Sequence, residues 1–489
     1  MKKLLLIGAA TLTVSNPTFA GDYLTNTNQH AAFLRMVARG ASIDVDGVYY
    51  NPAGLAFLPK DGVYLSLTNQ SAYQTRNITS TSSLWTLDGQ ETTRQYKGKA
   101  SAPIIPSLHA AYKKGNWVIS GTFAVGGGGG KASFDQGLPM FDAAAIGLIT
   151  QQTASLTSNF GYRMTPDKYN IETAMEGRQF IYGLQLGLSY KANENFSVFL
   201  GGRMNYFTGG YKGFLRVGLP ESTSTEVVTA IAAKYMAGGM SQEQAIAQAQ
   251  QLAAPMAEQL NNSKIELDCD QTGWGLTPII GIDAKFGKLN LAAKYEFKTN
   301  MNIENKTHTL ECPAEAKETM APFSDGVNTP NDIPSMLAVA ASYEILPTLR
   351  ASVEYHFFDD KQAGMADDKQ KALKRGTHEY LGGLEWDATK QLTLSGGFQK
   401  TSYGLSDDFQ KDTSFSCNSY SLGFGTRIRF TEALSLDLAY FWTTYKDYTK
   451  SGVRTELISK INPQLPTAND KDVYSRTNKV FGASINYRF

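Results

Sequence analysis

The residues that could carry catalysis or bind a metal in this sequence are its histidines, serines and cysteines. The five His residues are scattered along 489 positions, without the short spacing that metal ligands need. His356 has Ser residues nearby, as a Ser–His hydrolase requires, but the sequence contains no Gly-x-Ser-x-Gly turn. We therefore expect no catalytic residue, no metal and no cofactor, and a phospholipase or esterase is only an alternative function.

A run of five glycines, 126–130, is the most unusual local pattern. It is not a phosphate-binding loop, because Val125 stands where that motif needs Gly and Ala132 follows Lys131 in place of Ser or Thr. Glycines weaken a strand and permit a sharp bend, so a kink is expected where the strand 117–125 meets the run; a flexible loop root is the alternative. The candidates for this kink are Phe123, Val125, Gly126 and Gly127.

The three cysteines all fall in or next to long connections between the expected strands. In an oxidising compartment two of them could form a disulfide. Cys269 and Cys312 are the preferred pair because their loops flank the same expected hairpin, and free thiols are the alternative.

The net charge and the amino-terminal sequence limit the possible partners and the location of the protein. A formal net charge of +1 gives no general basic field, so we expect no nucleic-acid partner. Residues 1–20 combine Lys2 and Lys3, an apolar stretch and small residues before Ala20, which is the pattern of a secretory signal peptide. The rest of the chain is therefore expected outside the cytoplasm.

From residue 63 onward, apolar and polar residues alternate with a period of two. Leu184, Leu186 and Leu188 alternate with Gln185 and glycines, and the pattern recurs over about ten residues in each of fourteen segments, often with Tyr or Phe at the end. The expected strands lie near 63–74, 103–113, 116–125, 179–191, 195–207, 274–286, 288–299, 335–345, 348–358, 378–388, 391–401, 416–430, 433–446 and 478–489.

Six short and seven long connections alternate between these segments, which is typical of a bacterial outer-membrane β-barrel with tight periplasmic turns and large external loops. The last segment ends in Phe489 and resembles the terminal strand that the barrel-assembly machinery recognises. We therefore predict an all-β fold: a fourteen-stranded antiparallel transmembrane barrel over 62–489. We expect a monomer in the outer membrane of a Gram-negative bacterium, in contact with its lipid.

Residues 21–61 precede the first expected strand. Fourteen strands enclose more space than their own side chains fill, so this segment is expected to form a plug, or hatch, inside the barrel. Its fixed turn is predicted at Asn51, Pro52, Ala53 and Gly54, where Pro removes a donor and Gly permits a positive φ. A general diffusion porin is the alternative if the barrel is open.

The long connection 208–273 contains two helical patterns. One covers 225–237, and the second begins at the capping box Ser241–Gln244 and contains Pro255. Their apolar faces could capture a hydrophobic ligand or pack on each other; the candidates for capture are Ile231, Tyr235, Ile246, Met256 and Leu260. The polar faces of the strands also carry charges that could form internal ion pairs, contact the hatch or meet a ligand carboxylate: Arg203, Lys285, Lys294, Glu296, Arg350, Glu354, Asp437 and Arg488.

The segment Asp46–Ala56, the pattern Trp274–Gly281, the fourteen strands and the terminal Phe489 together resemble the FadL/TodX family of outer-membrane transporters of hydrophobic compounds. The resemblance covers the chain from residue 21 onward. It implies passive uptake of long-chain fatty acids or aromatic hydrocarbons. It further implies capture by external loops, movement of a hatch, and release through the barrel wall beside a kinked third strand.

Overall fold

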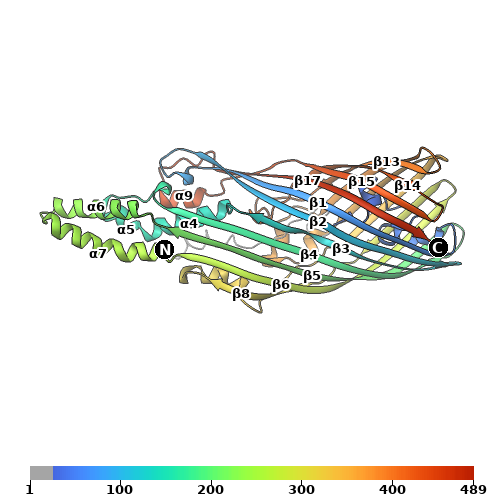
Figure 1. Cartoon of the computed structure of the whole chain (residues 1–489), viewed down its shortest axis with the longest axis horizontal. Helices are drawn as coiled ribbons and strands as arrows, with labels where there is room; N and C mark the ends of the chain where they lie inside the picture. Colours follow the sequence, from blue (N-terminus) through green and yellow to red (C-terminus); the bar gives the residue numbers. More distant parts are fainter. Residues whose placement is uncertain (1–25) are drawn as a thin grey trace.

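The structure is a computed structural model that describes residues 26–489. The predicted signal peptide, 1–20, lies outside these residues. Within them, one antiparallel sheet of 17 strands closes on itself, and fourteen of these strands form the barrel (Figure 1). Their bounds are β1 (Gly62–Ser82), β2 (Thr92–Lys114), β3 (Trp117–Phe134), β4 (Asn170–Lys191), β5 (Phe196–Gly218), β6 (Lys264–Phe286), β7 (Leu289–Glu296), β10 (Met336–Leu346), β11 (Leu349–Phe358), β12 (Thr377–Asp387), β13 (Leu392–Ser402), β14 (Ser419–Arg429), β15 (Leu434–Tyr445) and β17 (Lys471–Arg488).

Each barrel strand pairs with its neighbours in the sequence, and the ends of the chain complete the ring. β17 pairs with β1 from Tyr64↔Arg488 to Thr81↔Lys471. Apolar and polar residues alternate between the two faces of the wall, as predicted: Leu186 and Leu200 face outward, while Gln185 is buried inside. All fourteen predicted segments coincide with barrel strands, so the predicted fold class is confirmed.

The barrel is much taller on one side than the sequence predicted. Strands β1–β6 and β17 have 18 to 23 residues, whereas β7 and β10–β15 have 8 to 12. Parts of the predicted loops 75–102, 126–178 and 208–273 are therefore strands. Their outer residues are polar, such as Thr75, Asn77 and Thr79 on β1, while the inner Ile78 is buried, so the apolar outer face that marks a lipid-facing strand is missing there.

The long connections gather at one end of the barrel, the loop end, and the tight turns at the other, the turn end (Figure 1). The loops fold into three short strands and several helices with a hydrophobic core of their own. These elements are β8 (Asn302–Glu311), β9 (Asn328–Pro330), β16 (Tyr448–Ser451), α4 (Pro139–Gln152), α5 (Ala154–Phe160), α6 (Glu221–Ala237), α7 (Gln242–Asn261), α8 (Lys317–Met320) and α9 (Thr455–Ile461).

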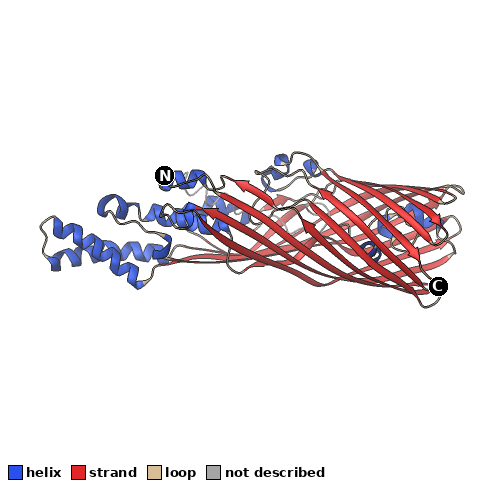
Figure 2. Cartoon of the chain, turned by 90° about the horizontal axis from the view of Figure 1, so that it is seen from above, coloured by secondary structure: helices blue, strands red, loops and turns tan. Residues whose placement is uncertain are grey.

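Helices α6 and α7 form a hairpin that projects beyond the strands (Figure 2). The Ser241 side chain accepts from the backbone N–H of Gln244, as the capping box predicts, and Pro255 lies inside α7. None of the helices in residues 26–489 is long and apolar enough to cross a membrane.

Residues 26–61, the inner segment, lie within the barrel near the turn end (Figure 2). The segment contains α2 (Ala31–Arg35), α3 (Gly47–Tyr50) and a 3₁₀ turn, Ala53–Phe57. Nearly all of its residues up to Leu58 are buried, and they contact inward side chains on both sides of the barrel.

Candidate functional site

The turn Asn51–Gly54 is fixed to three neighbouring strands. The Asn51 side-chain amide donates to the carboxylate of Asp283 on β6 at 2.6 Å. The hydroxyl of Ser189 on β4 donates to the Pro52 carbonyl at 2.6 Å, and that of Ser197 on β5 donates to the Ala53 carbonyl at 2.7 Å. A Cβ at Gly54 would overlap the Asn51 side chain, so glycine is required for the close approach.

Helix α2 is held to the opposite side of the barrel by buried ion pairs. Arg35 donates to Glu385 at 2.7 Å and to Asp437 at 3.0 Å. Arg39 binds Asp46 at 2.6 Å and Glu385 at 3.0 Å. Buried charges are stable only when they are paired in this way, and removing one partner is costly.

Glycines on the inner face of the wall let α2 approach the sheet backbone. A Cβ at Gly423 would overlap the Leu34 carbonyl, and one at Gly425 would meet Cβ of Arg35. At Gly482 it would meet the side chain of Leu34. The sequence identified Asp437 as a wall charge but missed its partner Arg35 and the glycines opposite α2.

Most of the other predicted charges on the wall either form ion pairs within the wall or contact the inner segment. Arg203 pairs with Glu296 at 2.7 Å, and Lys294 donates to the Tyr49 carbonyl of the inner segment at 2.8 Å. Glu354 accepts from the Gly40 backbone N–H at 2.7 Å. Arg350 pairs with Asp387 at 2.8 Å, whereas Lys285 and Arg488 line a polar cavity at the turn end.

The wall is interrupted between β2 and β3. Their pairing runs up to Leu108↔Phe123 and resumes only at Ser101↔Lys131. On β2 the unpaired stretch contains Pro103 and Pro106, which have no N–H to donate. On β3 it contains the glycine run, in which Gly128 and Gly130 have a φ of +83°.

The start of the inner segment fills this interruption. The backbone N–H of Asn26 donates to the Gly126 carbonyl at 2.9 Å, and its side chain donates to the Gly128 carbonyl at 2.9 Å. The Gln29 side chain donates to the Val125 carbonyl at 3.1 Å. Thus Val125, Gly126 and the adjacent Gly127 lie at the irregularity, and Phe123 is the last paired residue before it.

Pro103 and Pro106 of β2 are functional candidates that were not predicted from the sequence. A proline inside a strand pattern is itself a signal of a broken ladder. Gly126–Gly130 belong to β3, which continues to Phe134, and are not a loop root.

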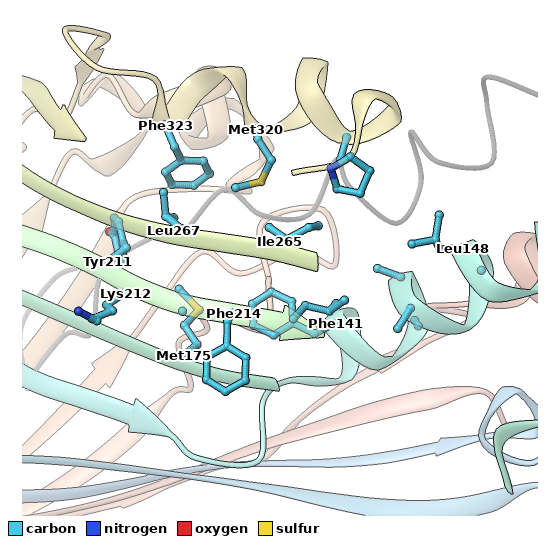
Figure 3. Close-up of a pocket in the computed structure, with 18 of the residues that line it drawn as sticks. Phe141, Leu148, Met175, Tyr211, Lys212, Phe214, Ile265, Leu267, Met320 and Phe323 are labelled. Atoms are coloured by element: carbon cyan, nitrogen blue, oxygen red, sulfur yellow. The ribbon is translucent and has the colours of Figure 1, made fainter. Parts of the chain in front are cut away.

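An apolar cavity of about 80 Å³ lies among the upper ends of β4–β6 and the loop helices (Figure 3). Figure 3 shows Phe141, Met175 and Phe214 on one side of it, and Met320 and Phe323 on the segment that covers it. Among the described residues of the lining, only Lys212 carries a charge, and it pairs with Asp268 at 2.8 Å. This composition suits a hydrophobic ligand.

None of the five predicted capture residues lines this cavity. Ile231 and Leu260 are completely buried, and Met256 is partly buried against the loop core. Tyr235 packs edge-on against Phe160 of α5, and Ile246 is 36% exposed. The apolar faces of α6 and α7 therefore serve chiefly to join the two helices to the rest of the loop core.

Strand β4 connects the cavity with the interruption and the inner segment. From the loop end, its inward residues include Met175 in the cavity lining, then Gln179, Ile181 and Gln185. Gln179 lies opposite Gly130 of β3 and is 1% exposed, and neither of its amide atoms has a hydrogen-bond partner among residues 26–489. The Gln185 side chain donates to the Val48 carbonyl of the inner segment.

No family model matches the chain, and no curated protein matches its sequence. Among solved structures, a FadL homologue from Pseudomonas aeruginosa matches with 14% identity over 97% of this chain and 99% of its own, at a TM-score of 0.59. The chain has a FadL-like fold. The Pseudomonas putida toluene transporter TodX matches with 11% identity over 91% of this chain and 94% of its own, at a TM-score of 0.51.

The predicted disulfide is absent from the FadL-like barrel. Cys269, Cys312 and Cys417 are all free, and Cys269 accepts from the Thr307 hydroxyl. The register explains this, because β6 pairs Leu267 with Leu310, which places Cys312 about four residues, or about 13 Å, along the ladder from Cys269. A disulfide requires Cα atoms within about 7 Å.

The geometry of His356 contradicts the pairing that a Ser–His hydrolase needs. Its Nε2 contacts Glu354 at 2.6 Å and its Nδ1 contacts Glu379 at 3.0 Å. Both ring nitrogens are thus engaged by carboxylates, and neither is available to activate a serine. Within residues 26–489 there is also no group of three or more His, Cys, Asp or Glu residues placed to hold a metal.

Proposed function

We propose that this protein is an outer-membrane transporter for hydrophobic small molecules, with the loop end external and the turn end periplasmic. The observation that carries the proposal is the interruption between β2 and β3, closed by Asn26 and Gln29 and linked along β4 to the apolar cavity. A ligand entering at the loops would reach the interruption without crossing the ion pairs around α2.

The outer surface supports a membrane location. Its exposed apolar residues include Leu186, Leu200 and Val353, whose side chains point away from the inner segment. A soluble protein would not expose this much apolar surface, whereas a lipid-facing barrel requires it. The terminal residue Phe489 suits recognition by the barrel-assembly machinery, and we propose a monomer.

The neighbours and the cavity together support the substrate class that we propose. One neighbour is described as a toluene transporter and the other as a FadL homologue. The apolar lining of the cavity suits long-chain fatty acids or aromatic hydrocarbons, for which the cavity must widen, and we propose passive uptake with release to the side through the wall. The inner segment then acts as the hatch, and the hairpin α6–α7 with its neighbouring loops as the surface where ligands collect.

A reversible cross-link tests the release route. In a background with the three native cysteines changed to Ser, the pair Asn26→Cys and Gly126→Cys would join the inner segment to β3 at a backbone-paired position. We expect oxidation to lower uptake of palmitate and toluene into liposomes at least tenfold, and reduction to restore it. The control is Asn26→Cys alone, and unchanged uptake by the oxidised pair would refute release at this interruption.

The porin alternative predicts a different electrical behaviour. The inner segment fills the barrel at the turn end, so we expect no large steady conductance in planar bilayers. A large open pore in the intact protein would contradict the proposed function.

A further inference from the structure

A row of exposed side chains that includes three cations crosses the outer face of the wall. The strand register places Lys479 of β17, Tyr73 of β1, Ser101 of β2, Lys131 of β3 and Arg178 of β4 opposite one another in turn. All five side chains are exposed on the outer face. Neighbouring strands lie about 4.8 Å apart, so this outer row is about 19 Å long.

The outer row lies at the border of the apolar surface on the side of the loop end. On β4, the five outward residues that follow Arg178 toward the turn end are all apolar: Phe180, Tyr182, Leu184, Leu186 and Leu188. Trp442 of β15 lies beside Lys479, so aromatic rings flank this lysine on both neighbouring strands. Aromatic residues mark the boundary between hydrocarbon and headgroups in membrane barrels. The cations of the outer row therefore lie at the depth of lipid headgroups.

Two cations of the outer row have acidic partners. Lys131 pairs with Glu176 at 2.5 Å, and Arg178 pairs with Asp270 at 2.6 Å. Between 36% and 59% of each of these four side chains is exposed. Exposed ion pairs contribute little to stability, so Lys131 and Arg178 can turn toward a phosphate at small cost.

Two further lysines add charge that no acidic residue balances. Lys479 belongs to the outer row, and Lys99 of β2 lies one position nearer the loop end, opposite Ser133 of β3. Both lysines are exposed, and neither forms an ion pair with a carboxylate of residues 26–489. Unbalanced lysines at a membrane surface attract anionic lipid headgroups.

The outer row crosses the interruption between β2 and β3 at its border toward the loop end. Ser101↔Lys131 is the first pair of the resumed ladder. Within the unpaired stretch of β2, the side chain of Ile104 is 74% exposed on the outside. An apolar side chain at this position needs a cover of hydrocarbon. A lipid held at the outer row would place its acyl chains over Ile104.

The neighbouring strand β1 prepares the interruption to face lipid. The side-chain oxygen of Asn69 accepts from the Ile105 N–H at 3.1 Å, and the Ser71 hydroxyl donates to the Pro103 carbonyl at 2.7 Å. Hydrocarbon cannot form hydrogen bonds with exposed backbone groups, so a strand that has lost part of its ladder needs such partners in a membrane. The outer side of the interruption is thus suited to contact with acyl chains.

We propose that Lys99, Lys131 and Lys479 bind the phosphate groups of an anionic lipid of the outer leaflet, whose acyl chains cover the outer side of the β2–β3 interruption. The partner that fits carries phosphates on its headgroup and several acyl chains, which is the chemistry of lipid A. Its headgroup would join β2 to β3 next to the place where their ladder is broken. The inference takes the orientation of the barrel from the proposed function but does not depend on any transported substrate.

The test is native mass spectrometry of the full chain in detergent, with lipid A and with dephosphorylated lipid A as probes. We expect the unchanged protein to retain one lipid A and to release the dephosphorylated form. The variant Lys99→Gln/Lys131→Gln/Lys479→Gln should bind lipid A about tenfold more weakly, or worse. The matched control removes three exposed lysines of the loop end that lie outside the outer row, and it should retain lipid A: Lys234→Gln/Lys374→Gln/Lys446→Gln.

A photochemical cross-link locates the bound lipid independently of the lysines. In a background with the three native cysteines changed to Ser, benzophenone attached at Ile104→Cys should capture lipid A. Val353→Cys on β11 is the control, because Val353 is also exposed on the outer face but lies far from β2 in the ring. Equal capture at the two positions would show that lipid A has no preferred place on the barrel and would overturn the inference.

The remaining results are equally decisive. Equal retention of lipid A by the outer-row variant and the unchanged protein overturns the inference, and so does an equal loss in the control variant. Displacement of lipid A by an excess of inorganic phosphate would show a site for free phosphate, which also overturns it. No transported substrate is present in these measurements, so a negative result leaves the proposed function standing, and a failure of uptake in liposomes leaves the lipid site standing.

Discussion

The side-chain amide of Asn51 and the carboxylate of Asp283 form a 2.6 Å hydrogen bond between the inner segment and β6, and both residues are buried. Asn290 also donates to this carboxylate, at 2.8 Å. The bond ties the turn Asn51–Gly54 to a single carboxylate of the wall. Its loss should loosen the turn without affecting the ladder of β6.

Asn51→Leu keeps the size of the side chain and removes its donor. A hydrogen bond to a charged group is worth about 1.5–3 kcal/mol, so the seated form of the inner segment should lose about that much. We expect faster proteolysis within 26–61 and a measurable ion conductance in planar bilayers. Asn77→Leu, on the outer face of β1, is the control, and a closed, protease-resistant Asn51→Leu protein would show that Asp283 does not hold the turn.

Gly423→Val should displace α2 from the wall. The new Cβ would overlap the Leu34 carbonyl, which is backbone and cannot move alone, and overpacking of this kind costs about 1–3 kcal/mol. The barrel should still assemble, with raised conductance as the readout. Gly396→Ala is a matched control because the nearest atom to its Cβ would be 3.7 Å away, and equal conductance of the two variants would refute the fit of α2 to the glycines.

The register of β6 and β8 predicts which cysteines can be joined. The unchanged protein, denatured without reductant, should give three reactive thiols. Thr307→Cys should lose two thiols on oxidation, since residue 307 lies opposite Cys269. A Cys269–Cys312 disulfide in the unchanged protein, detected by peptide mapping, would disprove this register.

Lys369 should make the loop end less stable as pH falls from about 10 to 7. Its pKa is lowered from 10.5 to about 7 by burial first and then by Lys411, Lys450 and Arg76. Because the folded state binds this proton less readily than the unfolded state, the stabilisation is present above pH 10.5 and is lost as pH falls through 7. Lys369→Met should flatten the pH dependence of loop proteolysis between pH 7 and 10, and Lys374→Met, an exposed lysine nearby, should leave it unchanged.

The barrel could be predicted from the sequence because lipid and interior impose opposite demands on successive residues. Leu184 and Gln185 differ in polarity for this reason, and the same alternation marks all fourteen strands. The upper parts of β1–β6 were not predicted because their outer face is no longer apolar. Thr75 or Asn77 on an outer face carries no signal that separates a strand from a loop.

The candidate site was only partly predictable. The irregular residues Val125 and Gly126 were identified from their glycine run, since glycine acts through the backbone alone. The lining of the apolar cavity could not be predicted. The apolar character of a residue such as Ile231 indicates that its side chain is buried, but it does not indicate which residues surround that side chain. Packing of α6 on α7 accounts for it, while Met175 and Phe214, in strands that read as loop, form the cavity.

The unequal height of the barrel wall has a consequence for its electrical properties. The apolar cavity and the broken β2–β3 ladder both lie among β2–β6, whereas Arg35 meets its carboxylates on β12 and β15. Under the proposed function, a ligand that follows the first side would move without parting the charges on the second. We then expect ion leakage and uptake of hydrophobic solutes to be independent traits, so that a mutation can change one while the other stays constant.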